Sequence, residues 1–259
     1  MGGSGALRGR RILVTRPLAQ SAGLAALLRG AGGEPVCVPA IEIRDIEDLA
    51  SAHAVADRLE EFRLAIFVSA NAVRRGLAIV RARRGPRAWP AGLRVATVGQ
   101  GSREALVAEG FADAIAPRGR ADSEALLALP ELADVGGSRI AIFRGDGWRA
   151  QLGEELERRG ASVAYAACYR RVRPDPAAAR AAWAAGADAI AVSSAEGLAN
   201  LLEMLGEEAR GRLAETPVFV PHARVAADAE RRGLRRVRVA GPRDAEMAAA
   251  VVAYFDGAG

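Results

Sequence analysis

Two short segments of the chain occur twice, and each copy has the pattern of a buried strand that leads directly into a helix. The segment at 65–71, Ala-Ile-Phe-Val-Ser-Ala-Asn, returns at 189–195 as Ala-Ile-Ala-Val-Ser-Ser-Ala. The segment at 11–16, Arg-Ile-Leu-Val-Thr-Arg, returns at 139–144 as Arg-Ile-Ala-Ile-Phe-Arg. Strand ends of this kind bind anions and other ligands, because the first N–H groups of the following helix are exposed there. The duplication therefore predicts two similar domains with ligand-binding strand ends.

Apolar runs and helical periodicity alternate along nearly the whole chain. Short apolar runs with few charges are typical of parallel strands that are buried on both faces. The chain is therefore predicted to be an α/β protein with two five-stranded parallel sheets, each flanked by helices in a flavodoxin-like arrangement. The ten predicted strands are 12–15, 35–38, 64–68, 94–98, 113–116, 140–143, 163–168, 187–192, 218–220 and 236–240.

Two extended stretches, 39–44 and 169–174, break this alternation. Both lie at a change of unit, so we expect them to connect the domains, paired with one another as strands. Two crossings mean that one domain is inserted in the other. The predicted first domain is 1–39 with 174–259, the inserted domain is 45–168, and the connectors are 40–44 and 169–173. The alternative is a linear split near residue 130 that follows the repeat.

The composition narrows the class of protein. A chain of 259 residues is long enough for two small α/β domains, and 51% hydrophobic residues suffice for their cores. Charges interrupt every apolar run before the roughly 18 residues that a membrane span needs. The N-terminal segment 1–5 has no apolar core of a secretion signal, so we expect a cytoplasmic protein that does not bind membranes.

Few residues are suited to metal or disulfide chemistry. Cys37 and Cys168 lie in apolar runs, which indicates two buried thiols in a reducing compartment. The two histidines, His53 and His222, are far apart and have no cysteine nearby. A structural zinc site is therefore not expected.

The net charge of +5 comes from arginine, because the chain contains no lysine. Aromatic residues make up 5% of the chain and do not alternate with the cations, as they do in many nucleic-acid-binding surfaces. A polyanionic small molecule fits this charge better than a nucleic acid does.

Polar groups follow several of the predicted strands. Ser69 with Asn71, and Ser193 with Ser194, stand at strand-to-helix turns, where a hydroxyl group either caps the helix or binds a ligand oxygen. Ser123 stands at another helix start and has the same two interpretations. The spacing of Gly99 and Gly101 lets backbone N–H groups approach an anion, and the corresponding turn at 220–224 holds His222 and Arg224.

Arginines end two other strands. Arg16 and Arg144 would point into a ligand crevice and bind carboxylates in a bidentate fork, or else form a salt bridge across the turn. Glu104 occupies the last glycine position of a dinucleotide fingerprint, which disfavours nucleotide binding. Neither a G-x-S-x-G elbow nor a carboxylate pair is found. The pattern therefore predicts a polycarboxylate that reacts by its own chemistry while the protein orients it.

These residues, in this order, resemble the uroporphyrinogen-III synthase family from about residue 10 to 255. The segments that carry the resemblance are Val14-Thr15-Arg16-Pro17, Phe67-Val68-Ser69-Ala70-Asn71-Ala72, Thr97-Val98-Gly99, Ser123-Glu124-Ala125-Leu126-Leu127, Arg144-Gly145-Asp146-Gly147, Cys168-Tyr169-Arg170-Arg171, Val192-Ser193-Ser194 and Gly197-Leu198-Ala199-Asn200-Leu201. The resemblance implies two α/β domains, one inserted in the other and joined by a two-stranded connector. It also implies a hydro-lyase that needs no metal or organic cofactor.

The implied substrate is hydroxymethylbilane, a linear tetrapyrrole with eight carboxylates. Loss of its hydroxyl group gives an azafulvene, which attacks ring D and forms a spiro intermediate. Fragmentation and reclosure then invert ring D and give uroporphyrinogen III. The alternative is a non-catalytic two-domain cleft protein that binds a polyanionic small molecule. We expect a monomer. The resemblance also suggests a transient contact with hydroxymethylbilane synthase.

The resemblance implies Tyr169 as the catalytic residue, because a phenol there can assist loss of the hydroxyl group. An aromatic ring that merely packs the connector is the alternative. The family often has Arg-Gly-x-Gly-Gly-Arg after the strand that ends at Arg144, whereas Trp148 replaces the second glycine here, before Arg149. Contacts with substrate at 147–149 are therefore expected to differ. The predicted substrate-binding residues are Thr15, Arg16, Ser69, Asn71, Thr97, Gly99, Ser123, Glu124, Arg144, Gly145, Ser193, Ser194, His222 and Arg224.

Overall fold

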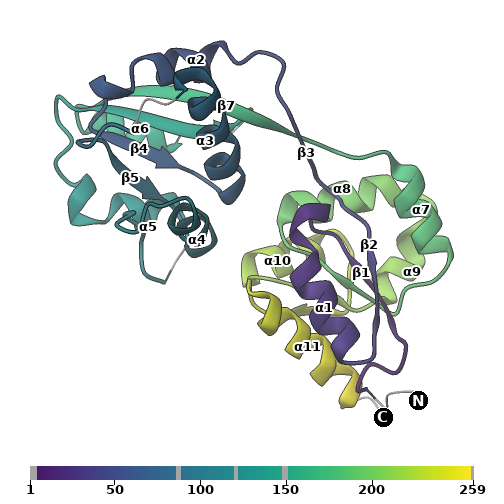
Figure 1. Cartoon of the computed structure of the whole chain (residues 1–259). Coiled ribbons are helices and arrows are strands. Elements are labelled where there is room, and N and C mark those ends of the chain that lie inside the picture. The colour runs from purple at the N-terminus through teal and green to yellow at the C-terminus, as the bar shows by residue number, and fades with distance from the viewer. Residues whose placement is uncertain (1–4, 86–88, 120–121, 148–150, 258–259) are drawn as a thin grey trace. The chain divides into compact units, whose positions relative to one another are not determined.

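The computed structural model describes residues 5–85, 89–119, 122–147 and 151–257. The chain divides into two compact units: unit 1 is Met1–Ile43 with Val172–Gly259, and unit 2 is Arg44–Arg171 (Figure 1). Unit 2 is thus inserted in unit 1, and the alternative of a linear split near residue 130 is wrong. The finer division, with separate connectors at 40–44 and 169–173, stays a prediction.

Unit 1 contains a five-stranded sheet in which each neighbouring pair of strands is parallel. Numbered in chain order within the unit, the strands lie in the order 2-1-3-4-5, which is the flavodoxin-like order. Along the sheet they are β2 (Glu34–Cys37), β1 (Arg11–Val14), β8 (Ala189–Ala191), β9 (Val218–Val220) and β10 (Val237–Val239).

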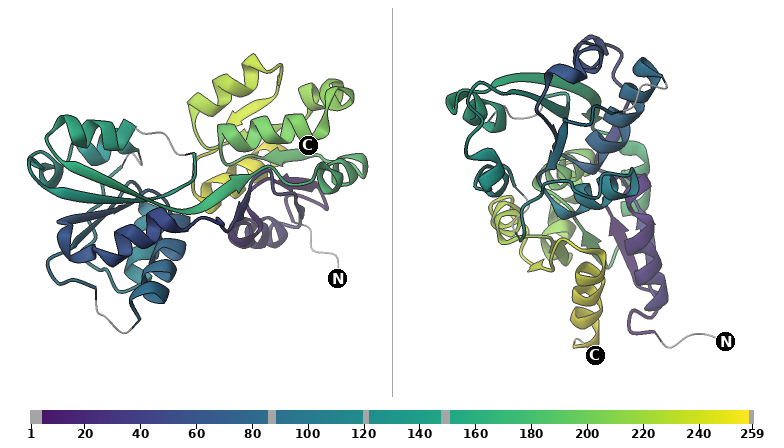
Figure 2. Two further views of the ribbon diagram at one scale, coloured as in Figure 1. Left: turned by 90° about the horizontal axis from the view of Figure 1, so that it is seen from above. Right: turned by 60° about the vertical axis from the view of Figure 1, so that its left-hand side comes forward.

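Helices cover both faces of this sheet. Leu13 packs with the helices of one face, whereas its neighbours Ile12 and Val14 pack with Leu24 and Met247 on the other, as expected for a strand with a two-residue period. α1 and α11 lie side by side on that second face (Figure 2). The helices of unit 1 are η1 (Leu18–Gln20), α1 (Ala22–Gly30), α7 (Pro176–Ala184), α8 (Ala195–Leu205), η4 (Glu207–Ala209), α9 (Arg210–Glu215), α10 (Ala223–Arg231) and α11 (Asp244–Asp256).

The second five-stranded sheet lies in unit 2, apart from the first two residues of β3 and the last residue of β7. Its strands lie in the order β3 (Glu42–Arg44), β7 (Ser162–Val172), β6 (Arg139–Gly145), β4 (Leu64–Phe67) and β5 (Arg94–Thr97). From β7 to β5 each neighbouring pair is parallel. The helices are α2 (Ala50–Asp57), η2 (Leu59–Glu61), α3 (Ala70–Arg84), α4 (Gln100–Ala108), α5 (Ser123–Leu127), η3 (Pro130–Leu132) and α6 (Gln151–Arg158).

The predicted fold class is confirmed, but one predicted strand is wrong. Within 113–116 only Ile115 pairs with β5, through a single bridge to Ala96. The ladder stops because the next donor would be Pro117, which has no N–H group. The fifth place in the sheet is taken at the opposite edge by β3, which lies in the stretch expected to be a connector.

The sequence repeat does not follow the two units. The first copy supplies β1 to unit 1 and β4 to unit 2, and the second copy supplies β6 to unit 2 and β8 to unit 1. The similar strands β1 and β6 therefore have different neighbours in their sheets, and so do β4 and β8. In the part of the chain that the structure describes, no helix is both long and apolar enough to cross a membrane.

Candidate functional site

The candidate residues gather at the carboxyl edge of each sheet. In a sheet with the order 2-1-3-4-5, ligands bind where the strand order reverses, between the first and third strands. That point lies between β1 and β8 in unit 1. The four parallel strands of unit 2, numbered in chain order, lie in the order 2-1-3-4, so the corresponding point is between β4 and β6. Thr15 and Ser193 follow β1 and β8 closely, and Ser69 follows β4 while Gly145 ends β6. Residues that were predicted from the sequence therefore lie where the strand order reverses in each unit.

Ser69 caps α3 and contacts the predicted catalytic tyrosine. Its Oγ accepts a hydrogen bond from the N–H of Ala72 at 3.1 Å, so it is the N-cap of the helix. The same Oγ lies 2.8 Å from the hydroxyl oxygen of Tyr169, and either group can be the donor. Tyr169 is completely buried, whereas Ser69 is half-buried. The two hydroxyl groups form a short chain that starts inside unit 2 and ends at its partly exposed strand edge.

A β-bulge brings Tyr169 to this position. The register of β6 and β7 pairs Arg144 with Ala167 but Gly145 with Tyr169, so Cys168 is skipped. The N–H of Asp146 then donates to the carbonyl of Tyr169 at 2.7 Å. A Cβ atom at position 145 would lie 2.7 Å from Cε2 of the Tyr169 ring, so the ring fits only because residue 145 is glycine. The lack of a side chain at Gly145 therefore makes room for the phenol ring.

Thr15 and Thr97 have matching roles in the two units. The hydroxyl of Thr15 donates to the carbonyl of Ala191 at the end of β8, at 3.1 Å. The hydroxyl of Thr97 donates to the carbonyl of Phe67 at the end of β4, at 2.6 Å. Both threonines are buried. Each hydroxyl group therefore joins two neighbouring strand ends within its own unit.

Other candidates in unit 2 lie at helix starts. Gly99 is the N-cap of α4 and has an extended backbone, with φ −162°. Asn71 is in the first turn of α3 and is half-buried. The first amide groups of both helices thus stand at the same strand edge, and such groups bind carboxylates well.

Arg144 lies over the ring of Tyr165, with its guanidinium carbon 4.5 Å from the ring centre. Burial raises the pKa of the Tyr165 hydroxyl group. Burial also raises the pKa of the Cys168 thiol to about 12, so this residue is a protonated, inert thiol at neutral pH. The predicted buried state of Cys168 is confirmed, while Cys37 is only half-buried.

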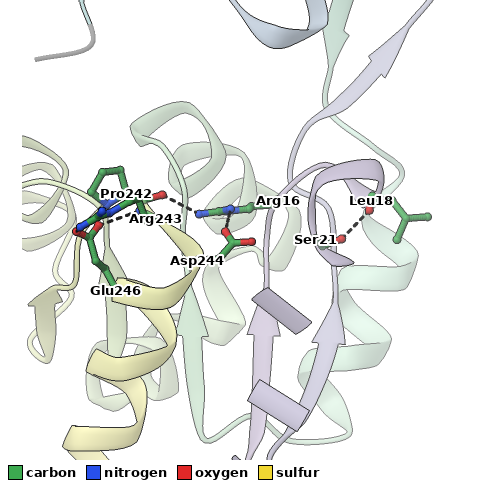
Figure 3. A network of polar contacts seen from close by, with 7 residues as sticks. All are labelled: Arg16, Leu18, Ser21, Pro242, Arg243, Asp244 and Glu246. Carbon is green, nitrogen blue, oxygen red and sulfur yellow. Dashed lines mark hydrogen bonds and ion pairs between the residues drawn. The ribbon is translucent and has the colours of Figure 1, made fainter. Parts of the chain in front are cut away.

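Arg16 takes part in an ion-pair network of unit 1 (Figure 3). Its guanidinium group pairs with the carboxylate of Asp244 at the start of α11 and donates to the carbonyl of Pro242 at 3.1 Å. Beside it, the carboxylate of Glu246 accepts hydrogen bonds from the backbone N–H of Arg243 at 3.0 Å and from its guanidinium Nε at 2.9 Å. Arg16 thus forms a salt bridge, but with a residue far along the chain and not across its own turn as the predicted alternative had it. A ligand carboxylate that binds Arg16 must compete with Asp244.

Asp244 was not predicted as part of a site. A Cβ atom on Gly23 would overlap its carboxylate, so Asp244 reaches the first turn of α1 as well as Arg16. The available signal was an acidic residue in a helix start at 242–246, but its partner stands at the other end of the chain. An internal carboxylate therefore occupies a place that suits a carboxylate ligand.

The remaining candidates of unit 1 lie at the starts of two helices. Ser194, and not Ser193, is the N-cap of α8, because its Oγ accepts from the N–H of Gly197 at 3.0 Å. His222 precedes α10 as its N-cap residue without a side-chain cap bond. His222 and Arg224 are both exposed. Their side chains are therefore accessible to a ligand at the edge of β9.

Ser123 and Glu124 belong to a different place in unit 2. They line a cavity of about 540 Å³ between α5 and α6, together with Arg158 and Arg159. Asp122 caps α5 through a 2.8 Å bond to the N–H of Ala125, so the capping role expected for Ser123 belongs to its neighbour. The structure therefore does not bring Ser123 and Glu124 to the Tyr169 hydroxyl.

Two further observations limit the chemistry. Within 5–85, 89–119, 122–147 and 151–257, no group of three or more His, Cys, Asp or Glu side chains has the arrangement of a metal site. A larger cavity of about 880 Å³ in unit 1, between α8, α9 and α10, is lined by none of the candidate residues. Trp148 and Arg149, at which a departure from the family pattern was expected, lie outside the described residues.

Two α/β units, one inserted in the other, with hydroxyl groups, arginines and helix starts at the strand ends, define a class of two-unit α/β proteins suited to anionic ligands. The model of the family described as uroporphyrinogen-III synthase HemD matches residues 22–250. The chain therefore belongs to the uroporphyrinogen-III synthase family, as the resemblance of the sequence predicted.

Relatives and solved structures agree with this assignment. The uroporphyrinogen-III synthase of Salmonella typhimurium is 34% identical over 163 residues, which are 62% of this chain and 64% of that protein. The Escherichia coli enzyme is 31% identical over 160 residues, with the same coverage. The matched part thus spans less than two thirds of these relatives.

Two crystal structures show the same fold. A mutant uroporphyrinogen III synthase from Thermus thermophilus has a TM-score of 0.63 at 18% identity, and covers 96% of this chain and 100% of its own. The Helicobacter pylori protein has a TM-score of 0.60 at 11% identity, and covers 95% and 99%. At these identities the likeness is one of fold alone.

Proposed function

We propose that the protein is a uroporphyrinogen-III synthase, a hydro-lyase that cyclises hydroxymethylbilane and releases water. The observation that carries the proposal is the family match over residues 22–250. The site supports it, because a phenol lies at a strand edge that offers helix amides and hydroxyl groups. No metal or organic cofactor is part of the proposed reaction.

The proposed reaction begins when the terminal hydroxyl group of the substrate leaves as water. This step needs a proton on the departing oxygen, and Tyr169 is the proposed source of that proton. The resulting azafulvene cation attacks the substituted carbon of ring D and gives the spiro intermediate. Fragmentation and reclosure at the other α carbon invert ring D, and loss of a proton from that carbon restores the pyrrole. The proton that assisted water loss is thereby returned.

The eight carboxylates of the substrate would be held by helix-start N–H groups and by arginine side chains at the strand ends. The first amides of α3, α4, α8 and α10 suit acetate and propionate arms. Arg16 and Arg224 of unit 1 add positive charge. The proposed site residues in each unit are those predicted from the sequence, except Thr15 and Thr97, whose buried hydroxyl groups hold strand ends together. The cavity that Ser123 and Glu124 line with Arg158 and Arg159 would hold a more distant arm.

A coupled assay tests the proposal. Hydroxymethylbilane is generated in place by its own synthase, the protein is added, and the oxidised products are separated by isomer. Mostly isomer III is expected. If only isomer I appears at high protein concentration, which is the product of spontaneous closure, the chain is not this enzyme.

The proposal includes a monomeric protein of the cytoplasm, with at most a transient contact with hydroxymethylbilane synthase. Sedimentation of the protein alone and with that synthase measures both statements. A single species at the mass of one 259-residue chain is expected alone. A stable complex at micromolar concentration would contradict the transient contact.

A further inference from the structure

The buried phenol and the half-exposed serine hydroxyl differ in what they can reach. Tyr169 is 0% exposed, while Ser69 stands at the surface end of the same hydrogen bond. A substrate that meets this edge of the sheet therefore meets Ser69 before Tyr169. A direct bond from the phenol to the substrate would require the tyrosine to leave its place between Gly145 and Ser69.

The burial of the phenol favours one direction for the proton in this hydrogen bond. A serine hydroxyl has one hydrogen to donate and two lone pairs that accept. One lone pair of Ser69 accepts the N–H of Ala72 at 3.1 Å. Among the described residues, the hydrogen bond of the Tyr169 hydroxyl is the one to Ser69, at 2.8 Å. The buried phenol proton is satisfied when Tyr169 donates to the second lone pair, and the hydrogen of Ser69 then points to the open side.

From this geometry we propose that Ser69 is the catalytic residue that contacts the departing hydroxyl group, and that Tyr169 acts through it. The inference rests on the proposed function and names the route of its proton. Ser69 gives its hydrogen to the leaving oxygen, and the C–O bond breaks to release water. Tyr169 gives its proton to Ser69 in the same step. When ring D is reclosed, the proton lost from the α carbon returns through Ser69 to the phenolate.

The surroundings hold the pair in this arrangement. The bulge in β6 and β7 places Tyr169 beside Gly145, where a Cβ atom would lie 2.7 Å from Cε2 and 2.9 Å from Cζ of the ring. Gly145 is therefore a positioning residue for the relay. The Gly145→Ala variant should separate the phenol from Ser69 without removing either hydroxyl group.

The variants Ser69→Gly, Ser69→Thr, Tyr169→Phe and Ser69→Gly with Tyr169→Phe test the relay. Glycine is a tolerable N-cap, so Ser69→Gly removes the hydroxyl group with little loss of helix stability. General acid catalysis commonly contributes 10²-fold or more, so we expect Ser69→Gly to lower kcat about 100-fold. Tyr169→Phe should lower it about tenfold, and the double variant should match Ser69→Gly. Ser69→Thr should restore most of kcat, and KM should change less than about twofold throughout.

Asp175→Ala is the matched control for loss of a helix cap. Asp175 caps α7 through a 2.7 Å bond to the N–H of Ala177 and contacts neither hydroxyl group. This variant should keep the wild-type kcat.

Two outcomes would overturn the relay while leaving the proposed function intact. One is a wild-type enzyme that makes isomer III but loses more activity in Tyr169→Phe than in Ser69→Gly. The other is a double variant whose loss is the product of the two single losses. A wild type that makes no isomer III would instead overturn the proposed function, and the relay with it. Labelling the tyrosine ring carbons and recording their resonances reports the Ser69–Tyr169 bond separately from activity.

Discussion

The carboxyl edges of the two units are built from the same parts but carry different chemistry. In both, a buried threonine hydroxyl joins two strand ends and a serine caps the helix that follows a central strand. In unit 2 the capping serine also contacts a buried phenol. In unit 1 the edge instead carries an arginine that pairs with the acidic start of α11.

The difference suggests that proton transfer belongs to one unit and the binding of charged groups to the other. A neutral pair of hydroxyl groups can move a proton, and an arginine can only attract charge, because its guanidinium group does not deprotonate in proteins. We therefore expect changes at the edge of unit 2 to alter kcat and changes at the edge of unit 1 to alter KM. The predictions below address this comparison from the largest effect to the smallest.

The largest expected effect concerns the helices that carry the two capping serines. A Cβ atom on Gly76 of α3 would lie 2.8 Å from Phe143 and 3.1 Å from Phe67, whose rings stack at 4.5 Å. Gly76→Ala should therefore lower the free energy of unfolding by about 2 kcal/mol, since overpacking costs more than the gain in helix propensity. Urea unfolding measures it.

The matched change in unit 1 is Gly197→Ala in α8. The nearest atom to its added Cβ would be Oγ of Ser194 at 3.2 Å, and that side chain can shift by a few tenths of an ångström. We expect a change within about 1 kcal/mol, because a small contact is offset by the better helix former. Equal losses in the two variants would show that α3 does not pack more closely than α8.

The second prediction uses the buried thiol of unit 2. Burial raises the pKa of Cys168 from 9.0 to about 12. Below pH 9 the thiol is protonated in both the folded and the unfolded chain, so it contributes nothing to pH dependence. Above pH 9 the unfolded chain loses this proton and the folded chain keeps it. The free energy of unfolding should therefore fall by about 1.4 kcal/mol for each pH unit up to about pH 12.

Comparison of variants isolates this contribution. Cys168→Ala should remove the extra slope between pH 9 and 10.5 in urea unfolding, whatever its offset at pH 7. Cys37→Ala, at the half-buried cysteine of unit 1, should retain the slope. The same slope in Cys168→Ala as in the wild type would mean that other groups cause the alkaline loss.

The third prediction concerns binding at the edge of unit 1. Arg16→Ala should raise KM about tenfold with kcat unchanged, which corresponds to about 1.4 kcal/mol of substrate binding. Asp244→Asn should lower KM by about threefold, because it removes the internal carboxylate that competes for Arg16 while keeping its shape. Steady-state kinetics of the isomer assay measure both.

Arg10→Ala is the control for loss of an ion pair. Arg10 pairs with Asp188 at 2.9 Å and precedes β1, so it lies at the amino edge of the same sheet. Its KM should stay at the wild-type value. A fall in kcat at constant KM in Arg16→Ala would place Arg16 in the chemical step and remove the division of tasks between the units.

The sequence allowed the architecture to be predicted because apolar strands and periodic helices are local patterns. The five strands of the unit 1 sheet occupy nearly the same segments that were predicted. The stretch 113–116 was predicted as a strand because it is apolar, yet Pro117 ends its pairing after one bridge. The missing N–H group of Pro117 ends the strand pairing, and the hydrophobic pattern does not reveal this.

The details of the site depend on contacts between distant segments. Cys168 and Tyr169 are both buried because a bulge interrupts the two-residue period, and nothing in the neighbouring residues marks the bulge. Ser69 and Tyr169 are joined across two intervening strands of the chain, and Arg16 meets Asp244 from the opposite end of the sequence. The resemblance named the tyrosine, but only the structure gives its serine partner.

The smallest effect is expected from the threonines that the two units share. Thr15→Val and Thr97→Val each remove a hydroxyl group that already donates to a strand carbonyl, at 3.1 Å and 2.6 Å. Each variant should lose about 1 kcal/mol of stability, the usual net value of such a bond. Because these hydroxyl groups are buried and occupied, kcat and KM should stay within about twofold of the wild type in both units.

Thr216→Val provides the reference for this last comparison. Thr216 is also buried and donates to the carbonyl of Arg212 at 2.8 Å, but it lies before β9 and so away from the carboxyl edge. Its loss of stability should equal that of the other two variants in urea unfolding. A rise in KM for Thr15→Val or Thr97→Val, with no such rise for Thr216→Val, would show that a strand-end hydroxyl turns to the substrate when it binds. The threonine edge would then belong to the binding surface in that unit, and the two units would share more than their scaffold.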